Sequence, residues 1–141
     1  MYKKTITYTD YDGNERTEDF FFNLTKAELM EMDFSERGGL EKMIKKIIET
    51  KDTKKIISIF KDLILRSYGE KSADGKYFEK IRDGHRLRDD FAQTEAYSEL
   101  FMELATNDVS ATEFITNIIP KNLADELSKN EQYQNGKPKL V

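Results

Sequence analysis

The chain has 141 residues, of which 38% are apolar and 35% charged, with a net charge of −4 and a pI near 5.2. This length is enough for one domain with a hydrophobic core. The chain has no cysteine and one histidine, which excludes disulfides, thiolate nucleophiles and zinc sites built from those residues. The acidic balance disfavours a nucleic-acid binder, which is normally basic.

The first ten residues, MYKKTITYTD, lack the apolar region of a signal peptide. No apolar run approaches the length of a membrane span. We therefore expect a cytoplasmic protein that has no membrane partner.

The first 22 residues predict a β-hairpin. In TITYT, threonines alternate with Ile6 and Tyr8, as in a half-buried strand. The turn is DYDGN, in which Gly13 can adopt a positive φ. The returning strand, RTEDFFF, places Phe20 and Phe22 on one face. Because two strands alone are marginally stable in water, this aromatic face must pack on the helices that follow.

Three helices are predicted between residues 25 and 68. Thr25 and Glu28 form a capping box that begins a short helix ending near Asp33. After two glycines, LEKMIKKIIE predicts a second helix. Its apolar stripe comprises Leu40, Met43, Ile44, Ile47 and Ile48. The third helix covers roughly 53–68 and is apolar on most sides, so we expect it to be central.

Two longer helices are predicted in the second half of the chain. Thr94 caps a helix that runs to about Ala105, and Ser110 and Glu113 form a second capping box. The stripe of the latter helix comprises Ala111, Phe114, Ile115, Ile118 and Ile119. Pro120 ends this helix or begins the next, because proline lacks an amide hydrogen and clashes with the preceding turn. One more short helical piece is expected at 123–127.

These elements predict an α+β fold that is mostly α-helical, a small helical bundle with an N-terminal β-hairpin packed on it. We expect a single domain over residues 1–127, with the hairpin at about 1–22. Residues 128–141, SKNEQYQNGKPKLV, are polar and predict a flexible tail.

The sequence contains no enzyme signature, since the phosphate-binding and nucleophile motifs rich in glycine are absent. His85 lies in a charged run and is expected to be exposed or bonded locally. A calcium loop starting at Asp74 would need oxygen ligands where the chain has Lys76, Phe78 and Lys80. We therefore predict no catalytic residue, no cofactor and no metal, and by exclusion a binding or assembly protein.

The stretch YGEKSADGKYFEK, residues 68–80, fits no regular period. We expect Gly69 to be the left-handed C-cap of the preceding helix, next to Tyr68. Asp74 and Gly75 predict a tight turn. That turn would bring Phe78 and its neighbour Tyr77 over the end of the bundle.

This stretch, together with RDDFAQTEAYSELFMELATN and EFITNIIP, resembles the tail assembly chaperones of long-tailed bacteriophages and prophages of Gram-positive bacteria. The resemblance covers roughly residues 65–120. It rests on Tyr68-Gly69, Lys71-Ser72, Asp74-Gly75, Phe78, Phe91, Thr94, Ala96-Tyr97, Phe114-Ile115 and Ile119-Pro120. The structural turn of this family-like motif comprises Tyr68, Gly69, Asp74, Gly75 and Phe78.

The resemblance implies a protein that binds the tape measure protein, keeps it soluble, helps to recruit tail tube subunits and is absent from the mature virion. It also implies that a longer form made by ribosomal frameshifting can exist. Such a client is long and helical, so its chaperone needs a groove lined by adaptable apolar side chains. The candidate partner-binding residues are Met43, Ile47, Phe114, Ile118 and Ile119, although the same stripes suit the domain's own core better.

The charges are uneven along the chain. Residues 40–66 hold eight Lys or Arg against four Asp or Glu, a net of +4, whereas residues 95–131 hold two Lys against eight Asp or Glu, a net of −6. Surfaces of opposite charge predict weak, salt-sensitive self-association along the client. The alternatives are a structural tail or connector subunit retained in the virion and, less favoured, an acidic adaptor that is not viral.

Overall fold

The computed structural model describes residues 1–35 and 53–120. The N-terminal hairpin is formed by β1 (Tyr2–Thr9) and β2 (Glu15–Phe22), which pair antiparallel over eight residues, from Tyr2↔Phe22 to Thr9↔Glu15. Gly13 has a φ of 84° in the turn. The predicted hairpin is confirmed.

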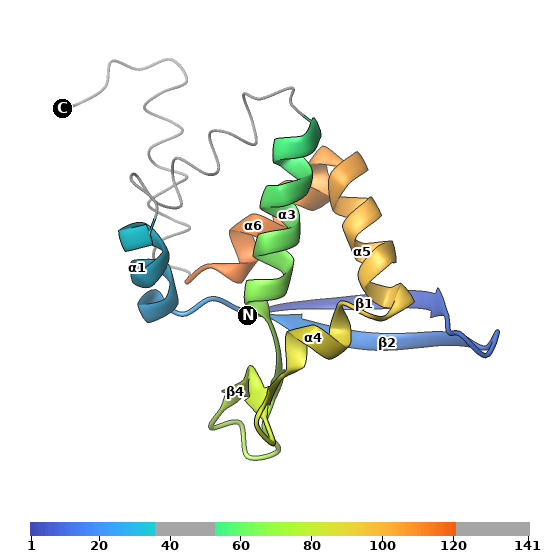
Figure 1. The fold of residues 1–141 in the computed structure, drawn as a ribbon, viewed down its shortest axis with the longest axis horizontal. Coiled ribbons are helices and arrows are strands. Elements are labelled where there is room, and N and C mark those ends of the chain that lie inside the picture. The colour runs from blue at the N-terminus through green and yellow to red at the C-terminus, as the bar shows by residue number, and fades with distance from the viewer. Residues whose placement is uncertain (36–52, 121–141) are drawn as a thin grey trace.

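The hairpin belongs to a larger sheet that the sequence did not predict. Its strand order is β1-β2-β3-β4, where β3 is Tyr68–Lys71 and β4 is Phe78–Glu79. A separate two-stranded sheet follows, formed by β5 (Ile81–Arg82) and β6 (His85–Arg86). In Figure 1 the β3–β4 pair lies on the opposite side of the β1–β2 hairpin from α3 and α5.

The helices of the described ranges agree with most of the predictions made for them, whereas the helices expected at 40–49 and 123–127 and the tail expected at 128–141 lie outside the described residues. The described helices are α1 (Lys26–Ser35), α3 (Thr53–Ser67), α4 (Leu87–Phe91), α5 (Glu95–Thr106) and α6 (Asp108–Ile118). The α1 capping box is present, because Glu28 N donates to Thr25 Oγ1 at 3.1 Å and Thr25 N donates to Glu28 Oε1 at 2.9 Å. Thr94 caps α5 by accepting from Tyr97 N.

The predicted start of α6 is wrong. The N-cap is Asn107, three residues before the expected cap Ser110, and the helix begins at Asp108. The Asn107 side chain accepts from the amide of Ser110 at 3.0 Å, so Ser110 lies in the first turn. The helix ends at Ile118, and Ile119 has extended backbone angles, as expected of a residue that precedes Pro120.

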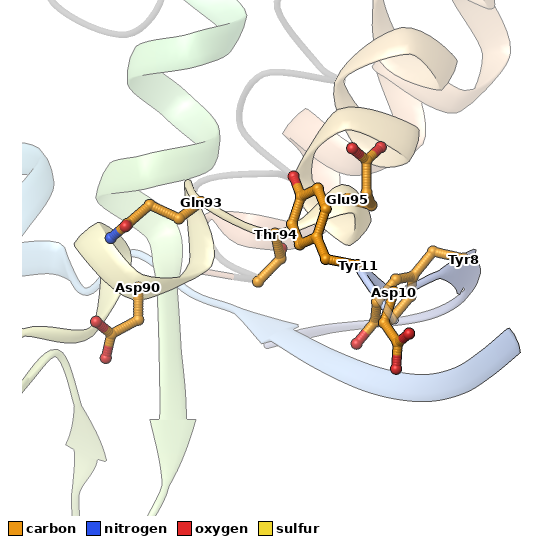
Figure 2. A pocket seen from close by; sticks show the side chains of 7 residues that line it. All are labelled: Tyr8, Asp10, Tyr11, Asp90, Gln93, Thr94 and Glu95. Carbon is orange, nitrogen blue, oxygen red and sulfur yellow. The ribbon is translucent and has the colours of Figure 1, made fainter. Parts of the chain in front are cut away.

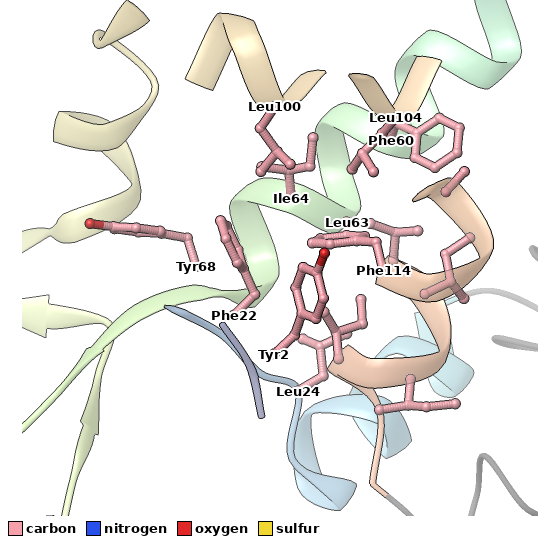
Figure 3. Packing of buried hydrophobic residues seen from close by; sticks show 14 of the residues in the cluster. Tyr2, Phe22, Leu24, Phe60, Leu63, Ile64, Tyr68, Leu100, Leu104 and Phe114 are labelled. Carbon is pink, nitrogen blue, oxygen red and sulfur yellow. The ribbon is translucent and has the colours of Figure 1, made fainter. Parts of the chain in front are cut away.

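One aromatic cluster fills the core between the sheet and the helices (Figure 3). Phe22 is fully buried, with its ring 5.5 Å from Phe114, 5.7 Å from Tyr68 and 5.8 Å from Phe91. Ile64 of α3 is also fully buried. The other face of the hairpin is polar and carries the cross-strand pairs Thr5–Asp19 and Thr7–Thr17. The α+β fold with a mostly helical body is therefore confirmed.

Distant parts of the chain close around this core. Asn23 N donates to the carbonyl oxygen of Ser67 at 2.7 Å, and Leu24 N donates to that of Ile118 at 2.7 Å. Lys4 of β1 forms an ion pair with Glu103 of α5 at 2.7 Å. The segment after β2 is thus fixed to the ends of both α3 and α6.

Candidate functional site

The family-like motif forms the β3–β4 hairpin, and its serine and aspartate build the turn. Ser72 Oγ donates to Asp74 Oδ1 at 2.7 Å and accepts from Tyr77 N at 3.0 Å. Asp74 Oδ1 also accepts from Lys76 N at 3.0 Å. Gly75 has a φ of 75°. These bonds confirm the tight turn and give the Ser-x-Asp-Gly pattern a structural role.

The expected role of Gly69 as a left-handed helix cap is wrong. Gly69 lies within β3, pairs with Phe21, and is not among the residues with a positive φ. A Cβ atom at this position would lie 2.5 Å from Cε2 of Phe78 and 2.8 Å from the carbonyl oxygen of Glu79. Glycine is needed here because the Phe78 ring packs directly on the strand.

The prediction that Tyr77 and Phe78 both cover the end of the bundle is wrong. Tyr77 is 58% exposed, whereas Phe78 is half-buried over Gly69. Tyr68 instead packs inward and stacks on Phe91 with ring centroids 4.3 Å apart. The motif residues therefore meet in one hairpin, where they fix β3 to the core.

The predicted partner-binding residues fall into two groups. Phe114, Ile118 and Ile119 are buried, with 0%, 0% and 4% of their surfaces exposed. They pack within the domain's own core, so a client could contact them only if α6 moved. Met43 and Ile47 lie outside the described residues. A role of these five residues in partner binding stays a prediction.

The charged run after β4 forms the β5–β6 hairpin, with Asp83 and Gly84 at φ values of 51° and 80°. Two successive positive φ values are characteristic of a type I′ turn. His85 is exposed, and its Nε2 lies 2.8 Å from Oδ2 of Asp90. The hydrogen bond to Asp90 raises the pKa of His85. The prediction of a locally bonded histidine is confirmed.

Lys80, between β4 and β5, joins three parts of the fold. Its Nζ donates to the carbonyl oxygens of Asn23 at 2.9 Å and Arg66 at 2.7 Å. It also donates to Oε2 of Glu28 at 2.5 Å. Burial lowers the pKa of Lys80, against the opposing effect of Glu28. Burial alone would raise the pKa of Glu28, but the bonds from Lys80 and the Thr25 amide bring it below its usual range.

A cavity of about 410 Å³ lies between α1, the C-terminal half of α3 and the segment from β5 to α4. We call it the α1–α4 groove. Its apolar lining includes Leu24, Met32 and Leu65. Arg88 and Ile81 line it from the side of α4 and β5. Acidic groups from α1 and α3 line it as well, so the groove combines apolar surface with charges of both signs.

A second hollow, of about 290 Å³, lies at the tip of the β1–β2 hairpin (Figure 2). Its carboxylates already have partners. Asp10 pairs with Arg16 at 2.6 Å, and Tyr11 forms a hydrogen bond with Glu95 at the start of α5. The first contact lies within the hairpin and the second joins the hairpin tip to α5, which gives this hollow a structural explanation.

Among the residues described, no cluster of three or more His, Asp or Glu side chains could hold a metal ion. Nor does any helix in the described ranges have the length and hydropathy needed to cross a membrane.

The comparison with protein families identifies the class. The model of the phage tail assembly chaperone family matches residues 1–139. The chain therefore belongs to this family. The comparisons with curated proteins and with solved structures gave no match. Family membership implies a client protein and leaves the non-viral adaptor without support.

The sequence patterns did not indicate that Lys80 joins three parts of the fold or that Arg88 lines the α1–α4 groove. Both lie in or beside IRDGHRLRDD, where a charged run normally indicates a solvated surface. The dipeptide Asp83-Gly84 was the available signal, because such a pair between short segments favours a hairpin. Recognising it would have placed these charges on a folded element.

Proposed function

We propose that this protein binds the tape measure protein, keeps it soluble until the tail tube polymerises around it, and helps to recruit tube subunits. The family match over residues 1–139 carries this proposal. A long helical client has apolar stripes that would otherwise associate, so a small partner with an amphipathic groove suits it. The protein would act in the cytoplasm of the bacterial host and leave before the virion matures.

Co-expression with the tape measure protein encoded beside this chain tests the proposal. We expect the client to be soluble only when the chaperone is present, and the two to co-purify. An equally soluble client that does not co-purify would contradict it. Mass spectrometry of purified virions gives the second readout, since a retained structural subunit would be present at fixed stoichiometry and a departing chaperone would be absent.

We also propose weak self-association of chaperone copies along the client. The charge difference between residues 40–66 and 95–131 supports it, because opposite charges attract most strongly at low ionic strength. Light scattering at low and high salt measures the effect. A mass that is independent of salt, both with and without client, would count against it.

A further inference from the structure

Arg88 differs from the other arginines that the structure describes. Arg16, Arg66, Arg82 and Arg86 each form an ion pair with a carboxylate. The Arg88 side chain makes no hydrogen bond or ion pair within the described ranges, although it is half-buried. A cation that is partly removed from water without a partner is unfavourable. An incoming carboxylate would remove this cost.

The acidic side chains of the α1–α4 groove do not supply that partner. Glu28 is paired with Lys80, and Asp62 is paired with Arg66 at 2.9 Å. The remaining one, Glu31, is exposed on α1. Among the described residues, Glu31 and Arg88 are therefore the groove charges without a partner, and of these two only the Arg88 guanidinium is partly removed from water.

The groove also presents apolar surface. Ile81 is 65% exposed at the groove, and Leu65 is half-buried in its lining. The walls are fixed in position, because Lys80 connects α1, the end of α3 and the segment after β2. A groove that is already formed loses little conformational entropy when a ligand binds.

We propose that the α1–α4 groove binds an amphipathic segment of the client, with a carboxylate of that segment pairing with Arg88 and its apolar side chains covering Ile81 and Leu65. This inference rests on the proposed function and specifies the chemistry of the client segment. Arginine suits the role, because its planar guanidinium binds a carboxylate through two parallel hydrogen bonds.

The test uses overlapping peptides of about 20 residues from the tape measure protein, enough for a helix that spans a small domain, with binding measured by fluorescence anisotropy. We expect Arg88→Glu to weaken the peptide that binds wild type best by about tenfold or more. Lys76→Glu is the matched control, since it makes the same charge change at the exposed β3–β4 turn. Ile81→Asp should also weaken binding, whereas Val109→Asp, at an equally exposed position on α6, should not.

Charge exchange makes the test specific. The acidic residue of the peptide that pairs with Arg88 is found by replacing each acidic residue in turn by lysine. That replacement should abolish binding to wild type and restore binding to Arg88→Glu. Circular dichroism confirms that each variant is folded.

The other outcomes are distinguishable. If wild type binds the client and Arg88→Glu binds it equally well, or if Lys76→Glu is just as harmful, the groove inference is wrong and the proposed function stands. If Arg88→Glu changes only the mass measured by light scattering and leaves peptide binding unchanged, the groove's occupant is a second copy of this chain. If wild type binds neither the peptides nor the intact client, the proposed function itself fails, and the inference fails with it.

Discussion

The β1–β2 hairpin and the two short hairpins of residues 68–86 both reverse the chain, but different interactions stabilise them. The first pairs eight residues and buries an aromatic face centred on Phe22. The short hairpins have two residue pairs each, and they depend on turn hydrogen bonds, a close glycine contact and the partly buried Lys80. Hydrophobic burial thus dominates in the long hairpin, whereas the short hairpins, anchored to the core by Tyr68, depend more on specific polar contacts and close packing.

The largest expected effect is in the first region. Phe22→Ala should reduce the free energy of unfolding by about 3–5 kcal/mol, the usual cost of truncating a buried phenylalanine. Tyr77→Ala, an aromatic truncation in the second region at a side chain that is 58% exposed, should change it by about 0.5 kcal/mol or less. Urea denaturation measures both. Similar losses in the two variants would contradict the comparison.

Gly69→Ala tests the close contact in the second region. The added Cβ would meet both the Phe78 ring and the carbonyl oxygen of Glu79, so we expect a loss of about 2–3 kcal/mol, in the range of overpacking. Adding Phe78→Ala should recover only part of it, because the backbone oxygen cannot move without disturbing the β3–β4 pairing. A fully stable Gly69→Ala protein would argue against this packing.

Lys80→Met should cost about 2 kcal/mol, because it leaves Glu28 and two carbonyl oxygens without their donor. Thermal unfolding at pH 7 measures the loss. The conservative variant Lys80→Arg keeps the charge but changes the geometry, so it should be intermediate. A neutral Lys80→Met result would show that water replaces these bonds.

The same pair predicts a pH dependence. Because the pKa of Glu28 is depressed in the folded protein, its contribution to stability is present above the ordinary value of 4.5 and is lost as the pH falls through the depressed pKa. The pKa of Lys80 is lowered by burial, so stability should rise slightly as the pH increases towards 10.5. Urea denaturation at a series of pH values measures how the free energy of unfolding changes with pH. In Lys80→Met this change should be smaller in both the acidic and the alkaline range. An unchanged pH dependence would assign it to other groups.

A smaller effect than those at Gly69 and Lys80 is expected from the turn serine. Ser72→Ala removes the acceptor of the Tyr77 amide and should cost about 1 kcal/mol. Thr7→Ala is the matched control in the long hairpin, where the bond to Thr17 joins two strands that already pair over eight residues. Equal losses in the two variants would show that the turn bonds of the second region have no special importance.

This difference also explains what the sequence could predict. Alternating aromatic residues, capping residues and apolar stripes depend on local periodicity, and they correctly predicted the long hairpin, α3 and α5. A strand of two to four residues is too short to show a period, so β3 to β6 were missed. The strand role of Gly69 could not be predicted, because it depends on Phe78, which is distant until β3 and β4 pair.

The candidate site was harder to predict than the fold. An apolar stripe indicates burial but does not say whether the chain's own core or a partner covers it, and the structure places Phe114 and Ile118 in the core. Conversely, Arg88 lies in a charged run that looks fully solvated. It lies just after the β5–β6 hairpin, for which Asp83-Gly84 was the one local signal, and that dipeptide does not indicate how far the Arg88 side chain is buried.

The bond from Leu24 to the carbonyl oxygen of Ile118, and the packing of Phe114 on Phe22, have a consequence for synthesis. The hairpin is made first, yet its aromatic face is covered only after roughly ninety further residues, which take about 5–20 s to translate at typical rates. During this interval the nascent chain exposes the kind of apolar surface that the proposed function would shield on a client. Ribosome-bound chains that end before and after Phe114 would therefore differ sharply in protease resistance.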